Sequence, residues 1–237
     1  QEHYPALRII DGVEISTRWH SFEIHIVGLN IDTGHPALQA FLADQQRKRE
    51  ERAAKIADKL AKCGFEGTLE RARRYAGVGQ ITRAHFARVL VDNFQVATLE
   101  KAFKLYLGKG KRAAVKAEWP DIAAAVKVIQ QAGGRAVLAH PIHYDMTTKW
   151  LRRLIAEFAE AGGDAAEVVF PGMSAEKQAL LHSIVAEYEL LASAGSDFHF
   201  PGRWTELGRC QLKSDTLTPV WHDWNLAVSQ SSIKDPV

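Results

Sequence analysis

The sequence contains little cysteine, no long apolar run and almost no net charge. Its 237 residues include only Cys63 and Cys210, too few for a disulfide framework or a thiolate metal cluster, so we expect a protein of a reducing compartment, the cytoplasm. No run approaches the roughly 18 consecutive apolar residues that a membrane-spanning helix needs. Thirty Lys and Arg face 28 Asp and Glu, and the net charge of +2 is too small to hold nucleic acid or an anionic membrane. Any anion must therefore bind at a local site.

Short apolar segments alternate with helical ones in the second half of the chain. Strand signals lie at residues 7–15, 22–30, 135–139, 167–170 and 190–194. Helical patterns lie at 120–131, 148–161 and 174–188, the last with Ser174 as its N-cap. This alternation predicts an α/β domain whose parallel sheet is connected by crossover helices.

The middle of the chain is helical throughout. Helical patterns at 36–63, 68–75, 82–92 and 98–106 follow one another without a strand signal between them. We therefore predict one α/β domain made of residues 1–35 and 119–237, interrupted by an all-helical insertion, residues 36–118. The basic run at 47–52 has interleaved acids, and a solvated helix face explains it better than an RNA site.

Five imidazoles and carboxylates stand on or just after the predicted strands. His140 follows the apolar run 135–139, Asp197 and His199 follow the run 190–194, and Glu14 and His25 lie in the first two strand segments. Nitrogen and oxygen donors without cysteine suit a hydrolytic Mn, Fe or Zn centre, which activates water and binds phosphoryl oxygens. This set of residues predicts phosphoester hydrolysis.

Each of these residues also has a simpler explanation. His25 lies among Ile and Val, as a hydrogen-bonded core histidine would, and Glu14 has Arg8 and Arg18 nearby as ion-pair partners. His140 before a proline can simply end a strand. Unrelated core histidines would not be expected to gather at separate strand ends together with two carboxylates, so the joint pattern favours a metal site.

The same residues carry a family resemblance. The segments 12–16, 25–29, 82–88, 139–141 and 195–199 resemble, in this order, the PHP (polymerase and histidinol phosphatase) family of metal-dependent phosphoesterases. The likeness is greatest to its ribonuclease AM branch, which removes nucleotides from short RNA and dephosphorylates nucleoside 3',5'-bisphosphates. It implies a distorted (β/α)7 barrel with a helical insertion, binding up to three divalent ions, usually Mn²⁺, with Fe²⁺ or Zn²⁺ as alternatives.

The resemblance also implies a role for each matching residue. Glu14 would bridge two ions, His25 and His140 would ligate one of them, and the catalytic pair Asp197 and His199 would complete the centre. The attacking species would be a metal-bridging hydroxide.

Substrate phosphates would be held by Arg83 and His85, although an Arg on a predicted helix, such as Arg83, is more often a surface cation. His143 stands where the family tends to have a phosphate-binding Arg, and its shorter side chain is neutral for much of the time near pH 7.

The chain also departs from the family pattern at its start. The family's first strand with a His-x-His pair, the Asp after it and a further His have no counterpart before Glu14, and five strand signals fall short of the seven that the barrel needs. We therefore expect an incomplete barrel, weak or inactive by itself. The expected ligand is a nucleotide or short RNA, with no membrane and no stable protein partner. Two alternatives stay open: a phosphatase of a small metabolite such as histidinol phosphate, and a non-catalytic nucleotide-binding module.

Overall fold

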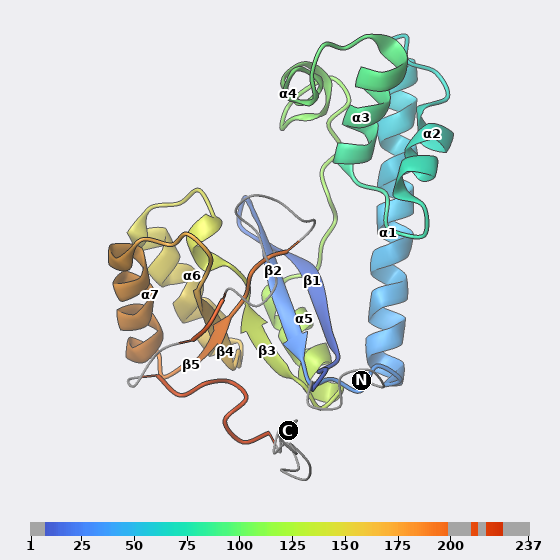
Figure 1. Ribbon diagram of the computed structural model, residues 1–237. Helices are drawn as coiled ribbons and strands as arrows, with labels where there is room; N and C mark the ends of the chain where they lie inside the picture. The colour runs from blue at the N-terminus through green and yellow to red at the C-terminus, as the bar shows by residue number, and fades with distance from the viewer. Residues whose placement is uncertain (1–7, 199–209, 213–216, 225–237) are drawn as a thin grey trace, which may run out of the picture. The chain divides into compact units, whose positions relative to one another are not determined.

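The computed structural model describes residues 8–198, 210–212 and 217–224 (Figure 1). The chain divides into two compact units, one of residues 1–38 and 120–237 and the other of residues 39–119. The first unit contains the sheet, and the second is helical. Among the residues that the structure describes, no helix is long and apolar enough to cross a membrane.

The sheet of the first unit has five strands in chain order. They are β1 (Gly12–Trp19), β2 (Phe22–Leu29), β3 (Arg135–Leu138), β4 (Ala165–Val169) and β5 (Leu191–Ala194). The strands β3, β4 and β5 run parallel, whereas β1 with β2 and β2 with β3 pair antiparallel. The parallel arrangement predicted from the second half of the chain is confirmed for β3, β4 and β5, but it does not extend to the first two strands. Only two residues connect β1 to β2, and a parallel pair needs a crossover of about a dozen or more.

The first strand lies later in the chain than predicted. It spans Gly12–Trp19 instead of 7–15, because a tight turn ties its end to β2: Trp19 pairs with Phe22, and His20 between them has a φ of +50°. This left-handed residue reverses the chain within two residues and thereby fixes the register of the hairpin.

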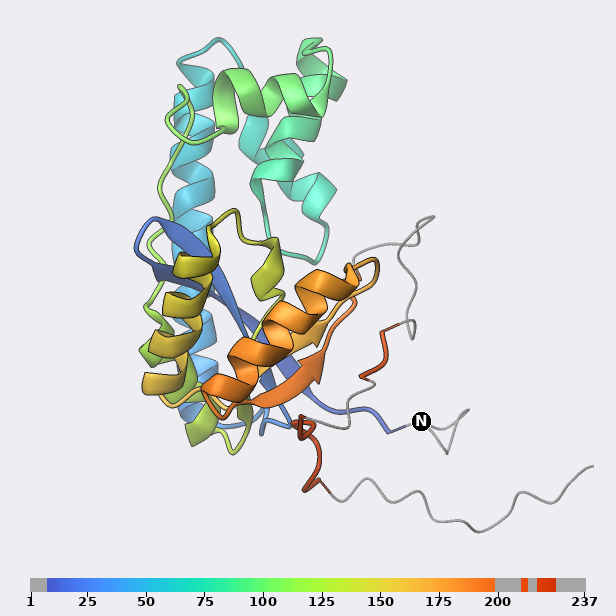
Figure 2. The same cartoon turned by 90° about the vertical axis from the view of Figure 1, so that its left-hand side faces the viewer.

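Three helices connect and cover the strands of the first unit (Figures 1 and 2). They are α5 (Ile122–Gln131), α6 (Thr148–Glu160) and α7 (Ala175–Glu187). The predicted N-cap of α7 is confirmed, since Ser174 Oγ accepts a hydrogen bond from the Lys177 N–H at 3.4 Å. Helix α5 packs so closely on β2 that a Cβ at Gly28 would lie 2.9 Å from the Ile129 side chain, so this position needs glycine.

The second unit has a hydrophobic core of its own. Its helices are α1 (Pro36–Ala61, which begins in the first unit), α2 (Thr68–Ala76), α3 (Arg83–Phe94), α4 (Leu99–Ala102) and the π-helix η1 (Phe103–Leu107). Leu60, Phe86 and Leu90 are fully buried in one cluster of this unit. The single helix predicted at 98–106 is instead a short α-helix that continues as a π-helix, in which the Gly108 N–H donates to the Phe103 carbonyl five residues earlier.

Candidate metal centre

The β1–β2 hairpin brings Glu14 and His25 together. Alternate residues of a strand face opposite sides of the sheet, and Ile15, Ile24 and Ile26 are buried. In the register, Ser16 lies opposite His25 and Glu14 opposite Val27, so Glu14 and His25 are diagonal neighbours on the other side of the sheet. His25 Nδ1 lies 2.8 Å from Glu14 Oε1.

His140 reaches the same place from the end of β3. The Ala139 N–H donates to the His25 carbonyl at 3.1 Å, which extends the β2–β3 pairing beyond the strand. His140 then turns out of the sheet with φ +32° and ψ +50°, a left-handed conformation that is uncommon outside glycine. The turn continues into the short helix η2 (Pro141–His143) and leaves His140 Nε2 3.4 Å from Glu14 Oε1.

The three side chains fit a divalent cation. One donor atom from each of Glu14, His25 and His140 can be chosen so that all three lie within 4.8 Å of one another. Among the described residues, the buried Nδ1 atoms of His25 and His140 have no hydrogen-bond partner; the short approach of His25 Nδ1 to Glu14 lacks hydrogen-bond geometry. Buried ring nitrogens without a partner are costly, and two imidazoles with one carboxylate suit Mn, Fe or Zn.

The charges of the three groups are coupled. The hydrogen bond with His140, and next the close contact with the His25 ring, hold the pKa of Glu14 well below its usual range despite burial. Burial lowers the pKa of His140, but its hydrogen bond with Glu14 and the charges of Glu167 and Asp197 outweigh this effect and raise it. Glu14 is therefore ionised at neutral pH, as a metal ligand must be.

The other predicted site residues are distributed differently. Asp197 and His143 line the same hollow of about 300 Å³ as the three clustered residues, together with Tyr144, but Asp197 is exposed and does not belong to the close group. His199 lies outside the described residues. Arg83 and His85 belong to the second unit, where the His85 ring accepts a hydrogen bond from the Thr82 N–H at the start of α3.

The expectation that all these groups stand at strand ends is wrong for Glu14 and His25. Glu14 is the third residue of β1, and His25 is the fourth residue of β2. Parallel strands bring residues together at their carboxyl ends, whereas an antiparallel hairpin brings them together wherever its register pairs them.

Two supporting residues were missed in the sequence. Glu167, partly buried on β4, accepts a hydrogen bond from the His140 N–H at 2.6 Å, and burial raises its pKa. Tyr144 accepts one from the His25 N–H at 2.8 Å. The signal for Glu167 was present, since it is the single charged residue in the otherwise apolar strand Ala165–Val169. Tyr144 gave no such signal.

Gly195 makes room for Glu167. A Cβ on Gly195 would lie 1.9 Å from Glu167 Oε1, far inside contact distance. The absence of a side chain after β5 therefore lets the Glu167 carboxylate reach the main chain of His140.

Comparison with known proteins identifies the family. No family model matches the chain. The 5'-3' exoribonuclease of Haemophilus influenzae is 47% identical over 216 residues, which are 91% of this chain and 78% of that protein. The 3',5'-nucleoside bisphosphate phosphatase of Chromobacterium violaceum is 37% identical over 220 residues, 92% of this chain and 77% of that protein.

A solved structure shows the same relationship. A Chromobacterium violaceum protein described as an amidohydrolase, with bound sulfate and no metal, has a TM-score of 0.77 and 38% identity, covering 90% of this chain and 74% of that chain. With identities of 47% and 37% to two hydrolases over more than nine tenths of its length, the chain belongs to the PHP family of metal-dependent phosphoesterases.

Proposed function

We propose that this protein hydrolyses phosphate esters at RNA ends or in nucleoside 3',5'-bisphosphates, the substrates in the names of its relatives. The observation that carries the proposal is the convergence of Glu14 on β1, His25 on β2 and His140 in the segment after β3. In a protein of this family, such a donor set supports metal-assisted hydrolysis.

The proposed cofactor is Mn²⁺, with Fe²⁺ or Zn²⁺ as alternatives, held by Glu14, His25 and His140. Asp197 lines the same hollow, and with His199 it is proposed to complete the ligand set and serve as the catalytic pair. When bound, the cation would supply positive charge to the phosphoryl oxygens and acidify a water molecule.

Other side chains of this protein are proposed to position the metal-binding imidazoles and the substrate. Glu167 and Tyr144 bind the main-chain N–H groups of His140 and His25, and so hold the two imidazoles toward Glu14. His143 is proposed to contact the substrate phosphate from the rim of the hollow, and Arg83 and His85 to bind phosphate from the helical unit.

The proposed architecture is an incomplete, distorted (β/α)7 barrel formed by residues 1–35 and 119–237, with residues 36–118 inserted. The alternation of β3, β4 and β5 with α6 and α7 supports this proposal, as does the TM-score of 0.77 to a relative.

Metal binding tests the site directly. We expect Mn²⁺ to bind the purified protein in isothermal titration calorimetry, and Glu14→Gln to weaken binding at least about tenfold, because the amide carries no negative charge. The matched control is Glu160→Gln, the same change at an exposed position of α6. Equal affinities of all three proteins would refute the assignment.

Substrate competition tests the reaction. We expect phosphate release from a nucleoside 3',5'-bisphosphate to require Mn²⁺ and to be inhibited by short RNA. Histidinol phosphate should be turned over much more slowly. Preference for histidinol phosphate would favour a small-metabolite phosphatase, and nucleotide binding without metal binding would favour a non-catalytic module.

A further inference from the structure

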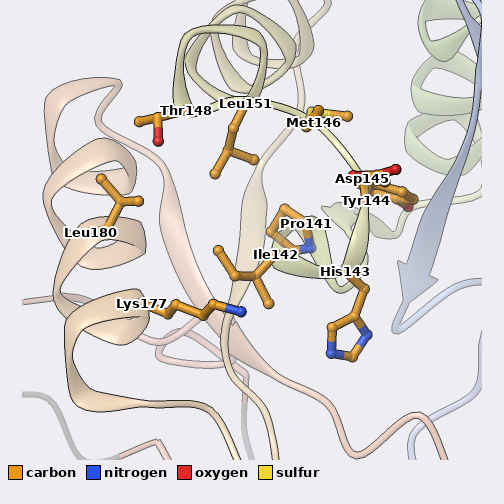
Figure 3. Close-up of a pocket in the computed structure, with 10 residues that line it drawn as sticks. All are labelled: Pro141, Ile142, His143, Tyr144, Asp145, Met146, Thr148, Leu151, Lys177 and Leu180. Carbon is orange, nitrogen blue, oxygen red and sulfur yellow. The ribbon is translucent and has the colours of Figure 1, made fainter.

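A second hollow adjoins the candidate metal centre. It has a volume of about 450 Å³ and shares His143 and Tyr144 with the hollow of Glu14, His25 and His140. This second hollow is formed by the chain after β3, the start of α6 and one side of α7 (Figure 3). Its volume is in the range of small-molecule sites, and whatever binds at the metal centre can extend into it.

The walls of the second hollow are about half apolar and half polar. Ile142, Met146, Leu151 and Leu180 contribute their side chains to it. Leu151 is only 4% exposed, so this part of the wall is anchored in the core. This apolar part of the wall suits the flat face of a nucleobase better than another phosphate.

Lys177 is the cation of the second hollow. Figure 3 shows its side chain reaching from α7 toward Ile142 and His143. A third, smaller hollow of about 180 Å³ is also lined by Lys177, Ile142 and His143. Lys177 therefore lines two adjoining hollows. Within the described residues, no carboxylate lies at ion-pair distance from its Nζ.

The charges in the second hollow are separated. Asp145, which also lines it, lies near Tyr144, on the side away from Lys177 in Figure 3. An ammonium is a point-charge partner for phosphate, whereas a carboxylate only accepts hydrogen bonds, as from an amino or hydroxyl group. The arrangement is therefore complementary to a nucleotide with its phosphate toward α7.

We propose that the second hollow binds the nucleoside part of the substrate and that Lys177 binds its second phosphate, the one that is not hydrolysed. This inference rests on the proposed function. A nucleoside 3',5'-bisphosphate and the end of an RNA share this feature: a second phosphate on the same nucleoside as the scissile phosphate.

Removing the charge of Lys177 tests the phosphate contact. We expect Lys177→Met to raise the KM for a nucleoside 3',5'-bisphosphate about tenfold or more, the usual loss for one charged hydrogen bond, and to leave kcat nearly unchanged. The KM for the two corresponding monophosphates should change less than about twofold. Lys149→Met, at an exposed position of α6 outside the hollow, is the control. Equal changes for bisphosphate and monophosphates, or no change, would overturn the inference.

A binding measurement separates this inference from the proposed function. If the wild-type protein does not hydrolyse the bisphosphate, the proposed function fails, but calorimetric binding of the bisphosphate still tests the subsite. Weaker binding by Lys177→Met than by Lys149→Met supports it, and equal binding or no binding by the wild type refutes it. A dinucleotide tested in parallel distinguishes an RNA end from a free bisphosphate.

The apolar wall has its own test. Leu180→Asn should weaken the binding of nucleoside mono- and bisphosphates without changing that of inorganic phosphate. Equal losses for nucleotides and inorganic phosphate would show that the wall does not contact a nucleoside.

Discussion

At the scale of the residue, Glu167 holds His140 in an unusual conformation. Its carboxylate accepts the His140 N–H, and His140 has a φ of +32°. Glu167→Ala leaves this donor without its partner, at a cost of about 1–3 kcal/mol in the free energy of unfolding, and should weaken Mn²⁺ binding about tenfold or more. Burial raises the pKa of Glu167, so a neutral side chain of the same shape should be tolerated there. Glu167→Gln should therefore keep most of the Mn²⁺ affinity that Glu167→Ala loses. Calorimetry that finds the Ala and Gln variants equally impaired would contradict a positioning role.

His182 makes the stability of the protein dependent on pH. Burial lowers its pKa in the folded state, and its buried Nε2 has no hydrogen-bond partner among the described residues. The unfolded chain therefore takes up this proton first as the pH falls below about 6.5, and the stability present above that pH is lost in acid. We expect His182→Leu to reduce the loss of Tm between pH 7.5 and 5.5 in differential scanning calorimetry. Parallel curves for both proteins would contradict this.

At the scale of the element, β4 and β5 act together through Gly195. The Cβ of Gly195→Ala would collide with Glu167 Oε1 and displace the carboxylate from His140. Mn²⁺ affinity should fall about as much as in Glu167→Ala, and the two changes should not add in the double variant, because both remove the same contact. Gly34→Ala, whose Cβ would lie 3.3 Å from a loop carboxylate, is the control. Additive losses would mean that Gly195 acts independently of Glu167.

At the scale of the whole molecule, each compact unit has its own core. Phe86 is fully buried in the second unit and Phe158 in the first. Each change to Ala should lower the free energy of unfolding by about 3–5 kcal/mol. Phe86→Ala should destabilise the second unit, and Phe158→Ala the first. We expect Phe86→Ala to lower the temperature of a calorimetric unfolding transition and to leave the Mn²⁺ affinity at 15 °C unchanged. Phe158→Ala should lower a transition temperature and also weaken Mn²⁺ binding. Equal losses of affinity in both variants would show that the units are not independent.

Much of the fold was readable from local pattern. The apolar run 135–139 followed by His140 and the serine before α7 predicted a strand end and a helix start at the places where the structure has them. These signals depend on residues close together in the chain, for which periodicity and capping are sufficient.

The donors Glu14, His25 and His140 could be recognised from the amino-acid sequence, because residue types and strand periodicity are local properties. How these donors meet depends on the folded chain: the hairpin register places Glu14 diagonally across from His25, and Glu167, far away in the sequence, holds His140. Contacts between distant segments depend on register and side-chain packing, which no single segment encodes.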